Sequence, residues 1–289
     1  MEVKIAKISG FCQGVNNAVS KSYQSIKSNN SIYCLGELVH NERVIEDLET
    51  NGMIFVESLN DVPNHSKVIF RAHGEPKERY QEAISKNLEI IDLTCPKVKL
   101  IHQKMQEMND AYIFLIGKHN HPESIASISY AKNGLIIETE EDIEKSNDFI
   151  LKSNFQKIYI LSQTTMSQIK FNNLVSKIKD KYKKIETIVD NTICNATFLR
   201  QKEVMELSKK VNKMIIIGGK NSSNTKELYN ISQNICNDTY LIHDSEELKN
   251  INFNEEDIVG ISAGASTPDY IILEVKYYLE NLYTKKLHL

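Results

Sequence analysis

The chain has 289 residues, with a hydrophobic fraction of 41%, a charged fraction of 25% and a formal net charge of −3. This length is too great for one ordinary small domain, and the apolar content is typical of a globular protein with substantial cores. The charge gives no electrostatic support for a nucleic-acid partner. The sequence has no secretion signal and no apolar run long enough to span a membrane, so we expect a cytoplasmic protein without membrane association.

Short β-branched runs alternate with amphipathic helical patterns along the whole chain. Eleven runs are predicted to be strands: Val3–Ile8, Ser31–Leu35, Lys67–Phe70, Glu89–Asp92, Tyr112–Ile116, Leu135–Ile137, Lys157–Leu161, Thr187–Val189, Lys213–Ile217, Thr239–Ile242 and Asp257–Ile261. Such alternation predicts an α/β fold with mostly parallel sheets. Eleven strands are too many for one small sheet, so several small α/β units are expected.

Three cysteines occupy equivalent places in this pattern. Cys12, Cys95 and Cys194 each follow a predicted strand and precede a predicted helix. We therefore predict three related units that each offer one cysteine to a common centre. Their predicted ranges are 13–95, 96–190 and 191–289, the last completed by residues 1–12. The two remaining cysteines, Cys34 and Cys236, are predicted to be buried packing residues.

The place of the three cysteines suits metal binding. Parallel α/β units put ligand sites at the carboxyl ends of their strands, and a helix N-terminus there favours the thiolate, which is the metal-binding form. Three thiolates are compatible with zinc or with an iron–sulfur cluster, although a fully ligated 4Fe–4S cluster takes four. From spacing alone, three unrelated core cysteines are an equally good interpretation, because the sequence contains no CxxC pair.

Histidines and small polar residues follow other predicted strands. His40, His73 and His121 lie in strand-to-helix loops and suit diphosphate recognition or proton delivery, whereas His102 and the other histidines are expected at the surface. Three further loops are rich in hydroxyl and amide groups: Gln163–Ser167, Gly218–Thr225 and Ser262–Asp269. Each is consistent with a simple helix cap, and together they predict a pocket for a phosphate or diphosphate.

Glu123 stands beside His121 at a predicted loop-to-helix boundary. It is either a proton donor or a first-turn residue that complements the helix dipole. The sequence alone does not separate these two interpretations.

In this combination the motifs resemble those of the LytB or IspH family, the 4-hydroxy-3-methylbut-2-enyl diphosphate reductases. The resemblance extends from Cys12 to Asp269 and follows the motif order of the family. The motifs are Gly10–Val15, the segment ending at His40, Ala72–Gly74, Thr94–Pro96, His121–Glu123, Gln163–Thr165, Thr192–Thr197, Asn221–Asn224 and Ala263–Ser266. Each motif is modest alone, but the nine in this order make coincidence a poor explanation.

The resemblance implies three α/β units in a pseudo-threefold arrangement around one central 4Fe–4S cluster per chain. Cys12, Cys95 and Cys194 match the cluster ligands, which leaves one iron without a protein ligand and open to the substrate hydroxyl. Thr164 and Glu123 match groups near that hydroxyl, with Glu123 as the proton source. The residues that match the diphosphate site are His40, His73, His121, Ser222, Ser223, Asn224 and Ser266.

The implied reaction removes the hydroxyl group of the small allylic substrate 4-hydroxy-3-methylbut-2-enyl diphosphate by reduction. Its products are isopentenyl and dimethylallyl diphosphate, at the last step of the non-mevalonate isoprenoid pathway. The resemblance also implies a ferredoxin or flavodoxin as the donor of single electrons.

One departure from the family pattern and three alternatives accompany this interpretation. Ser124–Ser127 replaces a segment after Glu123 that usually contains a glycine, which changes the backbone freedom expected there. The alternatives are a hydro-lyase with a three-cysteine 4Fe–4S cluster and a small phosphorylated substrate, a zinc enzyme with the same cysteines, and a non-catalytic sugar-phosphate-binding module based on Asn221–Asn224.

Overall fold

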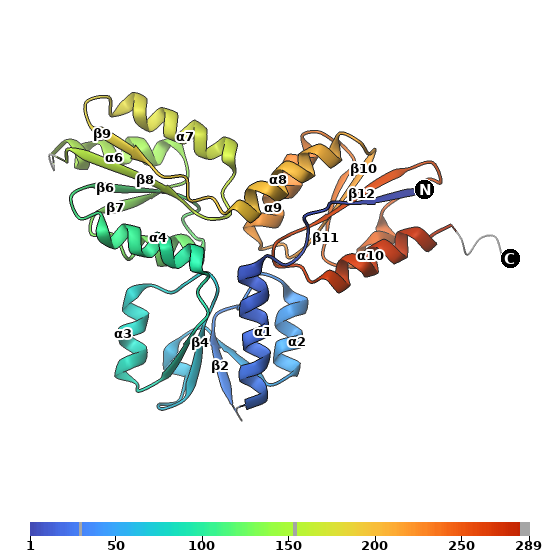
Figure 1. The fold of residues 1–289 in the computed structure, drawn as a ribbon, viewed down its shortest axis with the longest axis horizontal. Coiled ribbons are helices and arrows are strands. Elements are labelled where there is room, and N and C mark those ends of the chain that lie inside the picture. The colour runs from blue at the N-terminus through green and yellow to red at the C-terminus, as the bar shows by residue number, and fades with distance from the viewer. Residues whose placement is uncertain (29–30, 153–154, 284–289) are drawn as a thin grey trace. The chain divides into compact units, whose positions relative to one another are not determined.

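The computed structural model describes residues 1–28, 31–152 and 155–283. It contains three four-stranded sheets, all with parallel pairing, and helices that cover them (Figure 1). The α/β class and the three parallel sheets predicted from the sequence are confirmed. No helix among the described residues is both long and apolar enough to cross a membrane.

The first sheet along the chain has the order β3-β2-β4-β5. Its strands are β2 (Ile32–Leu35), β3 (Met53–Val56), β4 (Lys67–Phe70) and β5 (Glu89–Asp92). The helical segments in this part of the chain are α1 (Gln13–Ser28), α2 (Glu42–Thr50), η1 (Leu59–Asp61) and α3 (Lys77–Ser85).

The second sheet has the order β7-β6-β8-β9. Its strands are β6 (Tyr112–Ile116), β7 (Gly134–Ile137), β8 (Lys157–Ser162) and β9 (Glu186–Val189). The helices beside them in the chain are α4 (Pro96–Glu107), α5 (Pro122–Ile128), α6 (Glu140–Lys152) and α7 (Gln168–Lys181).

The third sheet has the order β1-β12-β10-β11 and is completed by the N-terminal strand. Its strands are β1 (Glu2–Ile5), β10 (Lys213–Ile217), β11 (Thr239–Ile242) and β12 (Ile258–Ala263). The helical segments are α8 (Asn195–Ser208), α9 (Ser223–Gln233), η2 (Ser245–Asn250) and α10 (Asp269–Asn281). β1 takes the place that β5 and β9 hold in the other two sheets, so one topology occurs three times.

The strand predictions need two corrections. β3 is absent from the eleven predictions, although Met53–Val56 is a β-branched and aromatic run after Gly52. As an edge strand it buries only Met53 fully, so its pattern is weaker than that of a central strand. The run Val3–Ile8 forms a strand only as far as Ile5, because the chain then leaves the edge of the sheet as a loop.

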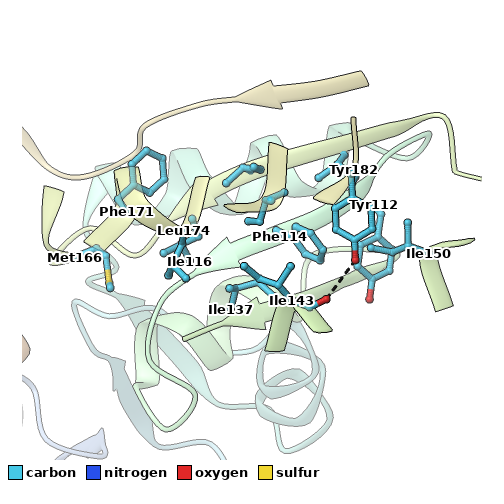
Figure 2. Packing of buried hydrophobic residues seen from close by; sticks show 13 residues of the cluster. Tyr112, Phe114, Ile116, Ile137, Ile143, Ile150, Met166, Phe171, Leu174 and Tyr182 are labelled. Atoms are coloured by element: carbon cyan, nitrogen blue, oxygen red, sulfur yellow. Dashed lines mark hydrogen bonds between the residues drawn. The ribbon is translucent and has the colours of Figure 1, made fainter. Parts of the chain in front are cut away.

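The second sheet shows how the strand pattern builds a core. Every residue of β6 is buried, because helices cover both faces of the sheet. Alternate side chains Tyr112, Phe114 and Ile116 pack toward α6 and α7 (Figure 2), while the intervening residues pack toward α4. Tyr182 packs in the core between the sheet and helices α6 and α7, and its hydroxyl donates to the Ile143 carbonyl at 3.3 Å.

Contacts divide the described chain into two compact units. Residues 1–16, 39–47 and 195–289 form the unit that we call the terminal unit, which contains the third sheet. Residues 17–38 and 48–194 form the central unit, which contains the first and second sheets. The three domain ranges expected from the sequence stay a prediction.

Candidate functional site

Cys12, Cys95 and Cys194 share one local geometry. Each directly precedes a helix: α1, α4 and α8 respectively. Each also donates its backbone N–H to the loop that follows the neighbouring strand of its own sheet. The acceptors are the carbonyls of Ala265 after β12, Ala72 after β4 and Thr164 after β8, at 3.1, 3.0 and 2.9 Å. The three cysteines therefore lie at the carboxyl edges of the three sheets, at the predicted strand-to-helix junctions.

The five cysteines fall into two classes. Cys12, Cys95 and Cys194 are partly exposed and form no disulfide, and the Cys12 sulfur accepts the Val15 N–H of α1 at 3.5 Å. Cys34 and Cys236 are buried, as predicted. Burial raises the pKa of both thiols, so they stay protonated and behave as apolar packing residues.

Glu123 is a buried carboxyl group in the first turn of α5. It is 2% exposed, and both of its oxygens are held by one residue. Thr164 donates its backbone N–H to Oε1 at 2.5 Å and its hydroxyl to Oε2 at 2.6 Å. Burial raises the pKa of Glu123 to about 7, against the opposing effect of these two bonds. A carboxyl group in this condition can donate a proton at neutral pH.

Thr164 joins this acid to a cysteine. Its carbonyl accepts the Cys194 N–H at 2.9 Å, while its N–H and hydroxyl face Glu123. The loop after β8 therefore fixes Glu123 and Cys194 with a single residue. The role expected for Thr164, close to the proton source, is consistent with this geometry.

Two candidate histidines of the central unit, His73 and His121, contact each other, and His121 also contacts Glu123. His121 is the N-cap of α5, and its Nδ1 accepts the Glu123 N–H at 3.1 Å. That contact leaves the proton of a neutral ring on Nε2, which is then a donor for an anion. His73, in the loop after β4, packs edge-to-face on His121 with 5.5 Å between the ring centroids.

A loop and a helix N-terminus that could accommodate an anion lie at the carboxyl edge of the third sheet. Ser222 is the N-cap of α9, and Ser223 and Asn224 begin that helix, where backbone N–H groups favour negative charge. Asn224 is 3% exposed, and neither Oδ1 nor Nδ2 has a hydrogen-bond partner among the described residues. Because an unsatisfied buried amide is costly, these atoms indicate a polar ligand at this place.

His40 is attached to this arrangement through its backbone. Its carbonyl accepts the Ser266 hydroxyl at 3.1 Å. A Cβ at Gly219 would lie 2.4 Å from the same oxygen, so the glycine lets the His40 loop approach the loop after β10. The terminal unit thus gathers His40, Ser222, Ser223, Asn224 and Ser266, whereas His73, His121, Glu123 and Thr164 belong to the central unit.

One expectation about a histidine needs correction. His102 is buried, not exposed: it is 6% exposed, stacks on Tyr130 with 4.2 Å between ring centroids, and burial lowers its pKa to about 4. Its helical spacing from Val98 and Met105, on the apolar face of α4, is the signal that the sequence analysis overlooked.

The missing glycine after Glu123 causes no irregular loop. Ser124–Ser127 lies inside helix α5, and the Ser124 hydroxyl donates to Gln163 Oε1 at 3.2 Å. Gln163 directly precedes Thr164, so this hydrogen bond lies next to the residue that binds the Glu123 carboxyl group.

Fold and site together define a class of three-sheet α/β proteins with one accessible cysteine at the carboxyl edge of each sheet. The chain matches the LytB protein family over residues 3–280. It is 40% identical to the 4-hydroxy-3-methylbut-2-enyl diphosphate reductase of Clostridioides difficile (strain 630), over 98% of this chain and 100% of the relative.

Two solved structures agree with this match. One is the E-1-hydroxy-2-methyl-but-2-enyl-4-diphosphate reductase of Plasmodium falciparum, with a TM-score of 0.84 and 32% identity, covering 97% of this chain and 87% of that one. The other is an (E)-4-hydroxy-3-methyl-but-2-enyl diphosphate reductase, described as the terminal enzyme of the non-mevalonate pathway, with a TM-score of 0.71 and 37% identity over 97% of this chain and 100% of that one. The chain belongs to the LytB family.

The two classes of cysteine predict a labelling pattern. In the metal-free native protein, iodoacetamide should modify Cys12, Cys95 and Cys194, and it should reach Cys34 and Cys236 only after unfolding, because burial shields those two thiols. Mass spectrometry of digested samples, native against urea-unfolded, measures this. Rapid labelling of Cys34 in the native chain would contradict the assignment.

Proposed function

We propose that this chain reduces 4-hydroxy-3-methylbut-2-enyl diphosphate to isopentenyl and dimethylallyl diphosphate, the last step of the non-mevalonate isoprenoid pathway. The observation that carries the proposal is the connection from Glu123 through Thr164 to Cys194, which attaches a proton donor to one of three equivalent cysteines. Membership of the LytB family and the names of its relatives support the substrate.

The cysteines fit one 4Fe–4S cluster per chain. Cys12, Cys95 and Cys194 are partly exposed cysteines at helix N-termini, while the two other cysteines are buried and protonated. Three thiolates leave one iron of such a cluster without a protein ligand. When bound, the cluster supplies electrons one at a time and Lewis acidity at that iron.

The diphosphate is the part of the substrate that the polar loops bind. In the terminal unit, His40, Ser222, Ser223, Asn224 and Ser266 offer amide, hydroxyl and backbone donors, and the unsatisfied amide of Asn224 is the sharpest sign of a missing partner. His73 and His121 of the central unit are proposed to add imidazole donors. Binding energy from this remote group orients the carbon chain for reaction.

Glu123 supplies the proton that the leaving hydroxyl needs. Two electrons and two protons enter, the carbon–oxygen bond breaks, one proton completes a water molecule, and the other forms a carbon–hydrogen bond on the allylic chain. Hydroxide is a poor leaving group, so protonation as the bond breaks lowers the barrier. The pKa of Glu123, raised to about 7, keeps a large share of this carboxyl protonated at neutral pH.

A small one-electron carrier, a ferredoxin or flavodoxin, is the proposed electron donor because an iron–sulfur centre accepts electrons singly. A cytoplasmic location and the absence of a nucleic-acid partner stay predictions from the sequence.

Anaerobic turnover tests the proposal directly. The purified chain should oxidise reduced methyl viologen and form both C5 diphosphates from 4-hydroxy-3-methylbut-2-enyl diphosphate, with about four irons and four sulfides bound per chain. Substrate consumption without any reductant would favour the hydro-lyase. Stoichiometric zinc in a colourless protein would favour the zinc enzyme, and binding without turnover would favour the sugar-phosphate-binding module.

Glu123 should give the reaction a defined pH dependence. Its protonated form is complete below the raised pKa and is lost as the pH rises, so kcat should fall above a pH of about 7. Glu123→Gln should lower kcat by about 10²–10⁴-fold and abolish this limb of the profile. Thr164→Val removes a hydroxyl that favours the carboxylate, so the limb should move to higher pH. An unchanged profile in both variants would assign the proton donor elsewhere.

Asn224 should contribute to diphosphate affinity. Asn224→Ala removes the unsatisfied buried amide and should weaken inorganic pyrophosphate binding about tenfold, as expected for hydrogen bonds to a charged ligand. Isothermal titration calorimetry on the purified chain measures the dissociation constant. Asn221→Ala is the matched control, because Asn221 lies in the same loop but is exposed and should bind pyrophosphate normally. Equal affinities in all three proteins would remove Asn224 from the site.

A further inference from the structure

The loop that carries Cys12 is the longest of the three cysteine loops. β5 ends at Asp92 and β9 at Val189, close to Cys95 and Cys194, whereas β1 ends at Ile5 and the chain runs through residues 6–11 before Cys12. A longer loop loses more conformational entropy when it is ordered. The loop before Cys12 therefore needs more stabilising contacts than the loops before the other two cysteines.

Two side chains on one face of helix α8 make hydrogen bonds that stabilise this loop. Glu203 Oε1 accepts the Lys7 N–H at 3.1 Å, and Arg200 Nη2 donates to the Gly10 carbonyl at 2.7 Å. Residues three apart on a helix lie side by side, so α8 holds the loop at both ends of the stretch before Cys12. Both contacts lie inside the terminal unit.

Arg200 is an unusual residue for this task because it is buried. It is 3% exposed, and its Nη1 also donates to the Ala196 carbonyl of its own helix at 3.0 Å. Removing a guanidinium from water is costly, so a buried one is expected where its charge or its fixed geometry is used.

Gly10 receives this contact in a conformation that suits only glycine. Its φ is +76°, and a Cβ there would lie 2.6 Å from Asp269 Oδ1 at the start of α10. The loop therefore packs closely against α10 at Gly10. The Gly10 carbonyl accepts a hydrogen bond from Arg200, and the Cys12 N–H donates one to the Ala265 carbonyl. The contacts orient the peptide two residues before the sulfur.

We propose that Arg200 is a positioning residue for Cys12. It acts through the Gly10 carbonyl, and its buried positive charge stabilises negative charge on the centre that Cys12 helps to hold. The second part rests on the proposed function, because it takes Cys12 as a cluster ligand. The first part concerns the chain alone.

Amide hydrogen exchange in the metal-free chain tests the positioning role. Arg200→Met should speed exchange of residues 6–12 about tenfold, as expected for loss of a charged hydrogen-bond donor, and leave residues 93–95 unchanged. Arg200→Lys keeps the positive charge but not the planar guanidinium group. Its exchange rate for residues 6–12 should lie between those of Arg200→Met and wild type. Lys202→Met is the matched control, because it removes the same charge from an exposed position in the same helix.

Two results would overturn the positioning role. One is unchanged exchange of residues 6–12 in Arg200→Met. The other is equal acceleration in the loop before Cys95, which would mark a general loss of stability. Arg200→Lys, which preserves volume and charge, keeps the test valid if the Met variant does not fold.

The charge effect is tested on the reconstituted protein by iron analysis and an EPR-monitored redox titration. Arg200→Met should retain less iron and show a lower reduction potential, while Arg200→Lys and Lys202→Met should keep a potential near that of wild type. Equal potentials in Met and Lys variants would overturn the electrostatic part. A wild-type chain that binds no iron would contradict the proposed function, and the exchange comparison would still decide the role of Arg200.

Discussion

The site depends on one hydrogen bond that the fold makes three times. The backbone N–H of each accessible cysteine donates to the carbonyl of a loop residue after the adjacent parallel strand: Ala265, Ala72 or Thr164. Parallel strands bring their carboxyl ends to one edge, so the chain leaving an edge strand passes the loop of its neighbour before its next helix begins. The bond fixes the cysteine backbone and leaves its sulfur accessible. Only at Thr164 do the same residue's N–H and hydroxyl also hold an acid, which makes one repeat chemically distinct.

Burial prepares two parts of the site in opposite ways. At Glu123, loss of water outweighs two hydrogen bonds that favour the carboxylate, so the pKa rises to about 7. At Asn224, loss of water leaves a neutral amide unsatisfied among the described residues, so the folded chain bears a cost that a bound anion relieves. In the proposed reaction, Glu123 donates a proton and Asn224 binds the diphosphate.

Local sequence patterns predict the strands, the helices and the positions of the cysteines. They do not predict contacts between residues far apart in the chain. The strand–helix alternation and the junction positions of Cys12, Cys95 and Cys194 follow from short-range periodicity. The hydrogen bonds of the Glu123 carboxyl group come from Thr164, 41 residues away, and the bond between Arg200 and Gly10 joins residues 190 apart. No single-sequence pattern contains such pairs, so the sequence does not decide the role of Glu123 and gives no sign of the contact made by Arg200. β3 was missed because an edge strand lacks the continuous apolar signal of a central one.

The loops before the three cysteines differ in length, and different hydrogen bonds order them. Before Cys95, Asp92 Oδ1 accepts the Thr94 N–H at 2.9 Å, and before Cys194, Asn191 Oδ1 accepts the Ile193 N–H at 3.1 Å. These are local Asx turns that order a short loop from within. The loop before Cys12 has one local bond, from the Ser9 hydroxyl to the Ala6 carbonyl at 3.2 Å, and it takes two further contacts from α8. Helix α8 directly follows Cys194 in the chain and also contacts the loop before Cys12. A change that distorts α8 should therefore affect two of the proposed ligands, Cys12 and Cys194, whereas a change in the Asp92 turn should affect only Cys95.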